Sequence, residues 1–311
     1  MKKLCIALCA LLFPLMAISA TPTIHVLKEK SQLPLADPFV MLDNGVYYAY
    51  GTHSDDGIEV YTSSDLKTWR LSALALDKKN TTQTRWFWAP EVYHIGNLYY
   101  MYYSANEHLY AATSTSPLGP FQQVGKEPFL PEGSIDGTLF RDDDGHYYFF
   151  FVRFSHGICM ARMNDDLTSI QAETIRPCIQ QSQNWEMDPL FPQSRVNEGP
   201  FVLKHHGKYY LTYSANDYRS QHYGLGLATA TNIMGPWTKS AQNPFLQNVG
   251  GLVGTGHHAF FFNKKGKLML IFHAHQSTQT VSPRLSYFID AKFSGQTIKI
   301  GKNILVPRLI P

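Results

Sequence analysis

Charged residues and cysteines are scarce in this sequence. Of the 311 residues, 16% are charged and four are cysteines, and the formal net charge is +3. Lysine and arginine cluster only in the short segment 263–267, which is typical of a solvated turn. This charge pattern argues against nucleic acid and against anionic membranes as partners. For Cys159 and Cys178, the sequence leaves open whether a disulfide forms.

Long apolar runs are absent beyond the first twenty residues. Residues 1–20 begin with two lysines near the N-terminus, continue as an apolar run and end in small residues, the three parts of a secretory signal. The run is too short to favour a membrane span, and neither Cys5 nor Cys9 sits at a lipoprotein cleavage point. The sequence therefore predicts a signal peptide over 1–20 and a single exported domain over 21–311, periplasmic or extracellular.

Aromatic residues are abundant. They make up 14% of the chain, and hydrophobic residues make up 44%. Such a composition fits a globular protein with a sizeable core. Tyrosine and phenylalanine favour β-strands, and their faces also pack well on the apolar side of sugar rings.

The sequence repeats one unit five times. Each unit has an apolar strand, a polar turn with glycine, an aromatic strand, and then a further strand, turn and outer aromatic residue. Four short strands in a repeat of about fifty residues are typical of a propeller blade. The sequence thus predicts an all-β, five-bladed β-propeller; an unrelated β-sandwich would not explain five matched starts. The units start at 36–50, 88–106, 135–151, 197–216 and 254–275.

Aligning the five starts places Asp37, Ala89, Asp136, Glu198 and His257 in one position. The first strand of each blade lies nearest the axis of a propeller, so three carboxylates and an imidazole are expected at one mouth of the central channel. Repulsion and burial there would raise the pKa of at least one carboxyl group. Such crowding is more often retained for chemistry than for packing.

Other charged residues near these positions are expected to be structural. Glu91 follows the second slot by two residues and is predicted to be structural or bound to water. Asp142, Asp143 and Asp144 lie in one turn and are predicted to be solvated. His258 alternates to the opposite face of its strand from the fifth slot and is predicted to be structural.

With these residues assembled, the chain resembles glycoside hydrolase family 43, whose fold is a five-bladed propeller. The resemblance covers about residues 33–300 and rests on ADPFV, WAPEV, SIDGTLF, NEGPFVLKHHGKYYLTYSAN and GTGHH. As a set these motifs are highly specific, although WAPEV alone would be weak. The resemblance implies an enzyme that hydrolyses O-glycosyl bonds of an oligosaccharide or polysaccharide.

The resemblance also implies roles for the three carboxylates. Asp37 corresponds to the general base, Glu198 to the general acid, and Asp136 to the residue that raises the pKa of the acid and orients it. Hydrolysis would invert the anomeric configuration, which requires acid and base to stand roughly 6.5–9.5 Å apart. The negative charge of Asp136 would keep Glu198 protonated near neutral pH.

Further residues carry over from the resemblance. Trp88 would form the aromatic wall of the sugar subsite with Ala89 beside it, His53 would lie next to the sugar, and Arg284 would donate to sugar hydroxyls. Each also has a structural interpretation, as a core tryptophan, a turn histidine or a surface arginine. His257 resembles a histidine that faces a central ion, often calcium, partly through water. No dense carboxylate cage is visible, so no cofactor is expected to be required.

The substrate stays open among several sugars. The resemblance implies release of α-L-arabinofuranosyl, β-D-xylosyl or β-D-galactosyl units, or internal cleavage of arabinan. No β-sandwich follows the propeller, which favours an exo-acting α-L-arabinofuranosidase on plant side chains, with β-xylosidase or β-galactosidase/galactofuranosidase as alternatives. A non-catalytic glycan-binding propeller would lack a carboxylate. The related retaining enzymes acting on fructans carry Arg-Asp and Glu-Cys where this chain has IDG and NEGP.

Overall fold

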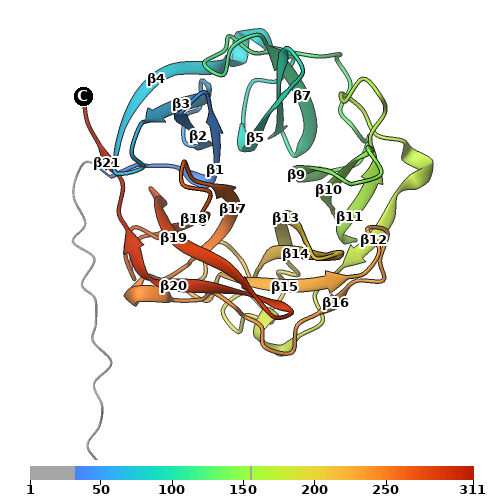
Figure 1. Cartoon of the computed structure of the whole chain (residues 1–311), viewed down its shortest axis with the longest axis vertical. Helices are drawn as coiled ribbons and strands as arrows, with labels where there is room; N and C mark the ends of the chain where they lie inside the picture. The colour runs from blue at the N-terminus through green and yellow to red at the C-terminus, as the bar shows by residue number, and fades with distance from the viewer. Residues whose placement is uncertain (1–31, 155) are drawn as a thin grey trace, which may run out of the picture.

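The computed structural model describes residues 32–154 and 156–311, so the predicted signal peptide lies outside the described residues. Five β-sheets surround a central axis, and the five-bladed propeller is confirmed (Figure 1). The helices among the described residues are short 3-10 turns. None of these helices is long and apolar enough to cross a membrane.

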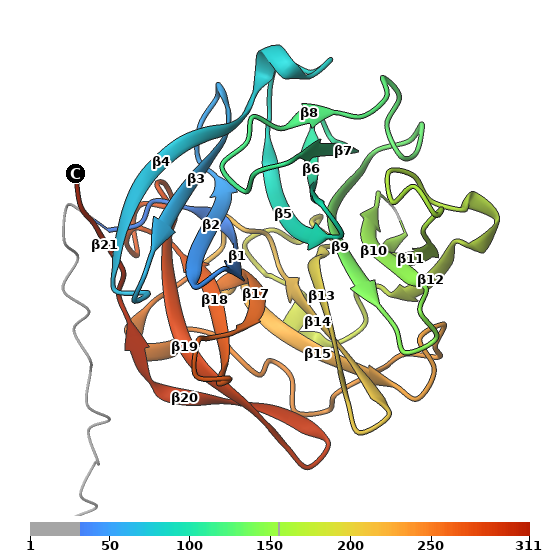
Figure 2. The ribbon, with the colours of Figure 1, turned by 45° about the horizontal axis from the view of Figure 1, so that its top comes forward.

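Each blade is a sheet of consecutive antiparallel strands, and its first strand lies nearest the axis (Figure 2). The first two blades contain β1 (Ala36–Asp43), β2 (Val46–Thr52), β3 (Gly57–Ser63), β4 (Thr68–Asp77), β5 (Trp88–Ile95), β6 (Leu98–Ala105), β7 (His108–Ser114) and β8 (Gln122–Gln123). The third and fourth contain β9 (Ser134–Arg141), β10 (Tyr147–Arg153), β11 (Gly157–Arg162), β12 (Arg176–Ile179), β13 (Asn197–His205), β14 (Lys208–Ala215), β15 (Gly224–Ala230) and β16 (Thr238–Lys239). The fifth contains β17 (Gly256–Phe262), β18 (Leu268–Ala274), β19 (Leu285–Ser294) and β20 (Thr297–Leu305), and the 3-10 turns are η1 (Lys78–Asn80), η2 (Ala172–Thr174), η3 (Asn184–Glu186) and η4 (Val249–Gly251).

The C-terminal strand closes the ring. β21 (Arg308–Leu309) pairs in parallel with β4, so the first sheet has five strands where four per blade were predicted. Gln32 adds a bridge to Arg308. Both ends of the propeller are thereby joined to the first blade, which protects its outer edge.

Tight turns connect the inner strands of each blade. Asn44 and Gly45 both have positive φ, 46° and 75°, between β1 and β2. His206 and Gly207 do the same between β13 and β14, at 49° and 72°. Two successive positive φ values suit the right-handed twist of a hairpin, and glycine adopts them without steric cost.

Aromatic side chains fill the space between neighbouring blades. Trp69 is fully buried and stacks on Phe288 across the ring closure, with centroids 5.8 Å apart and planes 6° apart. Tyr102 meets Phe149 between the second and third blades at 5.0 Å. The aromatic strands of the repeat therefore form the core, and they hold the inner strands in fixed positions around the axis.

Candidate active site

A bulge near the start of each inner strand brings one residue into a left-handed conformation. The pairing register shifts at this point in all five blades. Positive φ is rare for residues other than glycine, and strain of this kind clusters at functional sites. The five residues are Asp37 (48°), Ala89 (43°), Asp136 (57°), Gly199 (52°) and His257 (37°).

This geometry corrects the alignment of the fourth blade. The left-handed residue there is Gly199, so Glu198 lies one position earlier than predicted. Glu198 pairs with Ser214 just before the bulge, as Trp88 and Ile135 do with their partners in the second and third blades. The prediction that Glu198 shares a slot with the other two carboxylates is wrong by one residue. The sequence does not reveal this offset, because Glu198 directly precedes Gly199 and the spacing of the unit does not show which of the two adopts the left-handed conformation.

The left-handed residues link successive blades by hydrogen bonds. The N–H of Ala89 donates to Thr52 Oγ1 at 2.9 Å, and the N–H of Asp136 donates to Ser104 Oγ at 3.0 Å. Two further bonds of this kind cross the other blade boundaries: the N–H of His257 donates to Ser214 Oγ at 2.8 Å, and the N–H of Asp37 donates to His273 Nδ1 at 3.0 Å.

The third blade breaks this pattern. At the equivalent position on its second strand it carries Val152, whose side chain offers no acceptor. The N–H of Gly199 donates instead to Oδ2 of Asp136, at 3.0 Å. Glycine adopts the positive φ of Gly199 without strain, and a Cβ added there would make a tight contact of 3.2 Å with the His257 ring.

A cavity of about 210 Å³ lies at this end of the inner strands. The three predicted catalytic carboxylates line it together, although they come from three blades. Of the other predicted residues, Trp88, Arg284 and His257 also lie on its wall. The full lining is Asp37, Trp88, Ile135, Asp136, Glu198, Tyr218, His257 and Arg284.

Asp37 is surrounded by the Arg284 guanidinium group, a threonine hydroxyl and two histidines. Arg284 donates to both carboxylate oxygens, with Nη1 at 2.7 Å from Oδ1 and Nη2 at 3.3 Å from Oδ2, and Thr52 donates at 2.7 Å. His257 Nδ1 lies 3.4 Å from Oδ1. Burial raises the pKa of Asp37, but Arg284, His257 and His273 together outweigh burial and hold this pKa well below its usual range. Asp37 is therefore a carboxylate at neutral pH.

The pKa values of Glu198 and Asp136 are raised, whereas that of Asp37 is lowered. The pKa of Glu198 is raised to about 7, mainly by burial. The charge of Asp37 adds to this rise, and the hydrogen bond that Tyr223 donates at 2.7 Å opposes it. The pKa of Asp136 is raised well above its usual range, first by burial and then by the charges of Glu198 and Asp37. The hydrogen bond from the Gly199 N–H lowers this pKa but does not offset the rise. The expectation that the negative charge of Asp136 keeps Glu198 protonated is not supported, because burial and the charge of Asp37 raise the pKa of Glu198, and the pKa of Asp136 is itself raised. The two buried carboxyl groups interact strongly and retain a proton near neutrality.

Two predicted substrate-binding residues lie off the cavity wall. His53 directly follows β2 of the first blade, and its Nδ1 lies 2.7 Å from Glu59 Oε2. This hydrogen bond raises the pKa of His53, so the histidine is held by Glu59 and does not line the cavity. Ala89 is buried, and its contribution is the backbone N–H bond to Thr52.

The described residues do not fit a calcium cage. Within ranges 32–154 and 156–311, no group of three or more His, Cys, Asp or Glu side chains is placed to hold a metal ion. His257 faces the carboxylates of Asp37 and Asp136, with Nδ1 at 3.4 and 3.9 Å from them.

Asp142, His258 and the two cysteines lie away from the cavity wall. Asp142 is not solvated: it accepts from Tyr209 at 2.6 Å and pairs with Lys204, which joins the third and fourth blades. His258 is buried and bonded to a threonine hydroxyl, so its structural assignment is confirmed. Cys159 and Cys178 are unbonded.

Some residues of the site were missed from the sequence. Thr52 and His273 bond Asp37, and both lie at the end of the second strand of their blades or one residue before it, as Ser104 and Ser214 do in theirs. A polar residue at that recurring position is a signal that the repeat carries. Tyr223, the partner of Glu198, lies just before a third strand and leaves no such signal.

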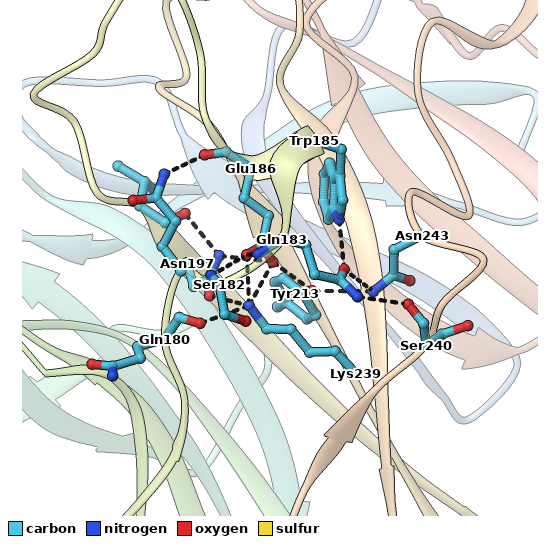
Figure 3. Close-up of polar contacts among 12 residues, drawn as sticks. Gln180, Ser182, Gln183, Trp185, Glu186, Asn197, Tyr213, Lys239, Ser240 and Asn243 are labelled. Carbon is cyan, nitrogen blue, oxygen red and sulfur yellow. Dashed lines mark hydrogen bonds and ion pairs between the residues drawn. The ribbon is translucent and has the colours of Figure 1, made fainter.

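A buried ion pair between Lys239 and Glu186 contacts Asn197, the residue before Glu198 in the sequence (Figure 3). Lys239 Nζ lies 2.8 Å from Glu186 Oε2 and donates to Asn197 Oδ1 at 2.9 Å. Tyr213 donates to Glu186 at 2.7 Å, and the Glu186 side chain is fully buried. This network holds Asn197, the residue that immediately precedes Glu198, in one orientation.

Comparison with known proteins decides the family. The sequence profile of Glycosyl hydrolases family 43 matches residues 31–288, most of the chain. The chain belongs to this family. It is therefore a glycosidase that hydrolyses O-glycosyl bonds, and its substrate is a carbohydrate.

Relatives within family 43 differ in the sugar that they release. A β-D-galactofuranosidase of Aspergillus niger is 25% identical, covering 85% of this chain and 81% of the relative. An extracellular exo-α-(1→5)-L-arabinofuranosidase of Cellvibrio japonicus is also 25% identical, covering 82% of both chains. A crystal structure of an endo-1,4-β-xylanase from Bacteroides thetaiotaomicron is 46% identical, with TM-score 0.86 and coverage of 90% and 98%.

Proposed function

We propose that this family 43 enzyme releases single sugars from the ends of polysaccharide side chains by an inverting mechanism. The observation that carries the proposal is the opposite ionisation of the carboxyl groups in one cavity. Asp37 is held as a carboxylate, whereas Glu198 and Asp136 together retain a proton near neutral pH. A base and an acid on opposite sides of one bond are what inverting hydrolysis needs.

In the proposed mechanism, Asp37 accepts a proton from a water molecule as that water attacks the anomeric carbon. Glu198 donates its proton to the leaving oxygen as the glycosidic bond breaks. Asp136 is held by the Gly199 N–H and keeps the proton of the pair available to Glu198. No cofactor takes part.

The remaining wall would bind the sugar. Trp88 offers an aromatic face for the apolar side of the ring. Arg284 is oriented by Asp37 and stacks over Tyr218, with its Cζ 4.8 Å from the ring centroid. Such a guanidinium can donate to sugar hydroxyls from a fixed position.

We favour α-L-arabinofuranose as the sugar released. A cavity of about 210 Å³ suits one sugar better than a chain, which supports exo action. The arabinofuranosidase of C. japonicus supports the choice of sugar. The Xylanibacter ruminicola β-xylosidase, 26% identical, and the A. niger galactofuranosidase support the alternatives.

Export is part of the proposal. The first twenty residues have the composition of a secretory signal, and two arabinofuranosidase relatives are extracellular proteins. A periplasmic or extracellular location would give the enzyme access to plant polysaccharide.

Hydrolysis of aryl glycosides by the purified mature chain tests this proposal. The panel comprises the α-L-arabinofuranoside, β-D-xyloside, β-D-galactoside and β-D-galactofuranoside, with Asp37→Asn as the blank. Release of the arabinofuranoside, lost in the blank, is the expected result. Hydrolysis of a different glycoside would change the assignment of the sugar. Turnover by Asp37→Asn equal to that of the wild type would overturn the assignment of the base.

A further inference from the structure

A second cavity adjoins the catalytic one. Its volume is about 340 Å³, and it lies between the third and fourth blades. Ile135 and Glu198 line both cavities, so these two residues form the boundary between them. A substrate that fills both cavities would place its scissile bond beside this carboxyl group.

The position of Glu198 gives the second cavity a role, and this step rests on the proposed function. The general acid protonates the leaving oxygen, so it lies on the leaving-group side of the scissile bond. Asp37 lines the first cavity and not the second. The sugar to be released would occupy the first cavity, and the part of the chain that leaves would occupy the second.

The second cavity is basic. Arg153 and Arg195 line it, with the amides of Gln180 and Gln181, and Glu198 is the one acidic residue on its wall within the described chain. Arg153 is paired with Glu132, so Arg195 carries the uncompensated positive charge, and a neutral polysaccharide would give it no charge to bind.

Both arginines have N–H donors without an acceptor among the described residues. Arg195 is exposed and has no hydrogen bond or ion pair with any residue that the structure describes. Arg153 binds Glu132 through Nη2 at 2.6 Å, but its Nε is buried and has no partner among the described residues.

We propose that the second cavity binds a leaving group that carries a carboxylate, namely a uronic acid residue of an acidic polysaccharide. The planar guanidinium groups of Arg195 and Arg153 match a carboxylate in geometry and charge. The amides of Gln180 and Gln181 suit the ring hydroxyls. Because Glu198 is protonated when the enzyme is active, it does not repel such a ligand.

Inhibition of aryl glycoside hydrolysis tests this inference. The aryl group would occupy the second cavity, so a sugar bound there competes with it. The probes are D-glucuronate, D-galacturonate and the neutral methyl esters of both. At about 20 mM salt we expect the acids to inhibit roughly ten-fold more strongly than the esters, and this preference should shrink at about 0.5 M salt. The two acids show which configuration fits.

Variants locate the charge that is responsible. Arg195→Gln should remove most of the preference for acid over ester, and Arg153→Gln should reduce it. Arg70→Gln, at an exposed position on the outer strand of the first blade, is the matched control and should retain the preference. Equal inhibition by acid and ester in the wild type would overturn the inference, and so would an unchanged preference in both cavity variants.

This inference and the proposed function can fail separately. If the wild type hydrolyses an aryl glycoside but does not distinguish acid from ester, only the inference fails. If it hydrolyses none of the panel, the proposed function fails. Saturation-transfer NMR with the same four probes then still tests whether the arginines select the carboxylate.

Discussion

The backbone N–H of Gly199 donates to Oδ2 of Asp136 at 3.0 Å, where the other blades bond to a side chain on a neighbouring second strand. Val152 occupies the position of that acceptor in the third blade. The absence of a hydroxyl at Val152 therefore leaves the Gly199 N–H to the carboxylate. Asp136 is oriented by a bond that the rest of the ring does not make.

Val152→Thr should compete for this N–H. Threonine has nearly the shape of valine and adds an acceptor close to Gly199. Without the N–H bond the pKa of Asp136 should rise further, and kcat should fall several-fold with a shifted pH profile. Val60→Thr, at a buried position on the third strand of the first blade, is the control for the cost of burying a hydroxyl. A Val152→Thr profile that matches the wild type would contradict the role of the Gly199 bond.

The pH profile of kcat/KM should have one limb in the neutral range. Activity requires Glu198 protonated, and its raised pKa of about 7 means that activity is lost as the pH rises through neutrality. Asp37 must be ionised, and its lowered pKa keeps it so across the working range. Tyr223→Phe removes a donor to the ionised form of Glu198, so the alkaline limb should move upward by about one pH unit. A downward shift would contradict the assignment of the acid.

Glu198→Gln should separate substrates by their leaving groups. An activated aryl glycoside needs little protonation, so it should retain part of its rate, whereas a natural oligosaccharide should lose about 10³-fold or more. The rates of the variant on aryl glycosides of graded leaving-group pKa test this expectation. Equal losses across the series would show that Glu198 does not act as the acid.

Lys239→Met should destabilise the protein strongly. It leaves Glu186 buried without its cation, which typically costs about 3–5 kcal/mol and should lower Tm by several degrees. The double variant with Glu186→Gln should recover part of the loss. Lys267→Met breaks the exposed pair with Asp290 and should cost less than about 1 kcal/mol. Equal effects of the two single variants would contradict the account of the buried pair.

Much of the fold could be predicted from the sequence because each repeat specifies its hairpins by residues that are close together in the chain. Turns such as Asn44–Gly45 and alternating aromatic residues specify hairpins within each blade. The fifth strand of the first sheet could not be read this way, because β21 pairs with β4 across almost the whole chain. Such a contact leaves no local pattern.

The sequence predicted which three carboxylates share the cavity, but it placed Glu198 one position away from its place in the structure. The carboxylates recur at the starts of units, which brings Asp37, Asp136 and Glu198 to one mouth. A one-residue offset at Gly199 depends on which residue adopts positive φ, and sequence spacing does not specify that. The contact of Tyr223 with Glu198 could not be predicted for a similar reason, because it depends on how the loop before the third strand packs.

The anomeric configuration of the first product is the most direct test of the account. Proton NMR during hydrolysis of the aryl glycoside that the enzyme cleaves fastest would follow the sugar before it equilibrates. If Asp37 activates water while Glu198 protonates the leaving group, the product first appears with inverted configuration. A product that first appears with retained configuration would make a carboxylate the nucleophile and would contradict the account.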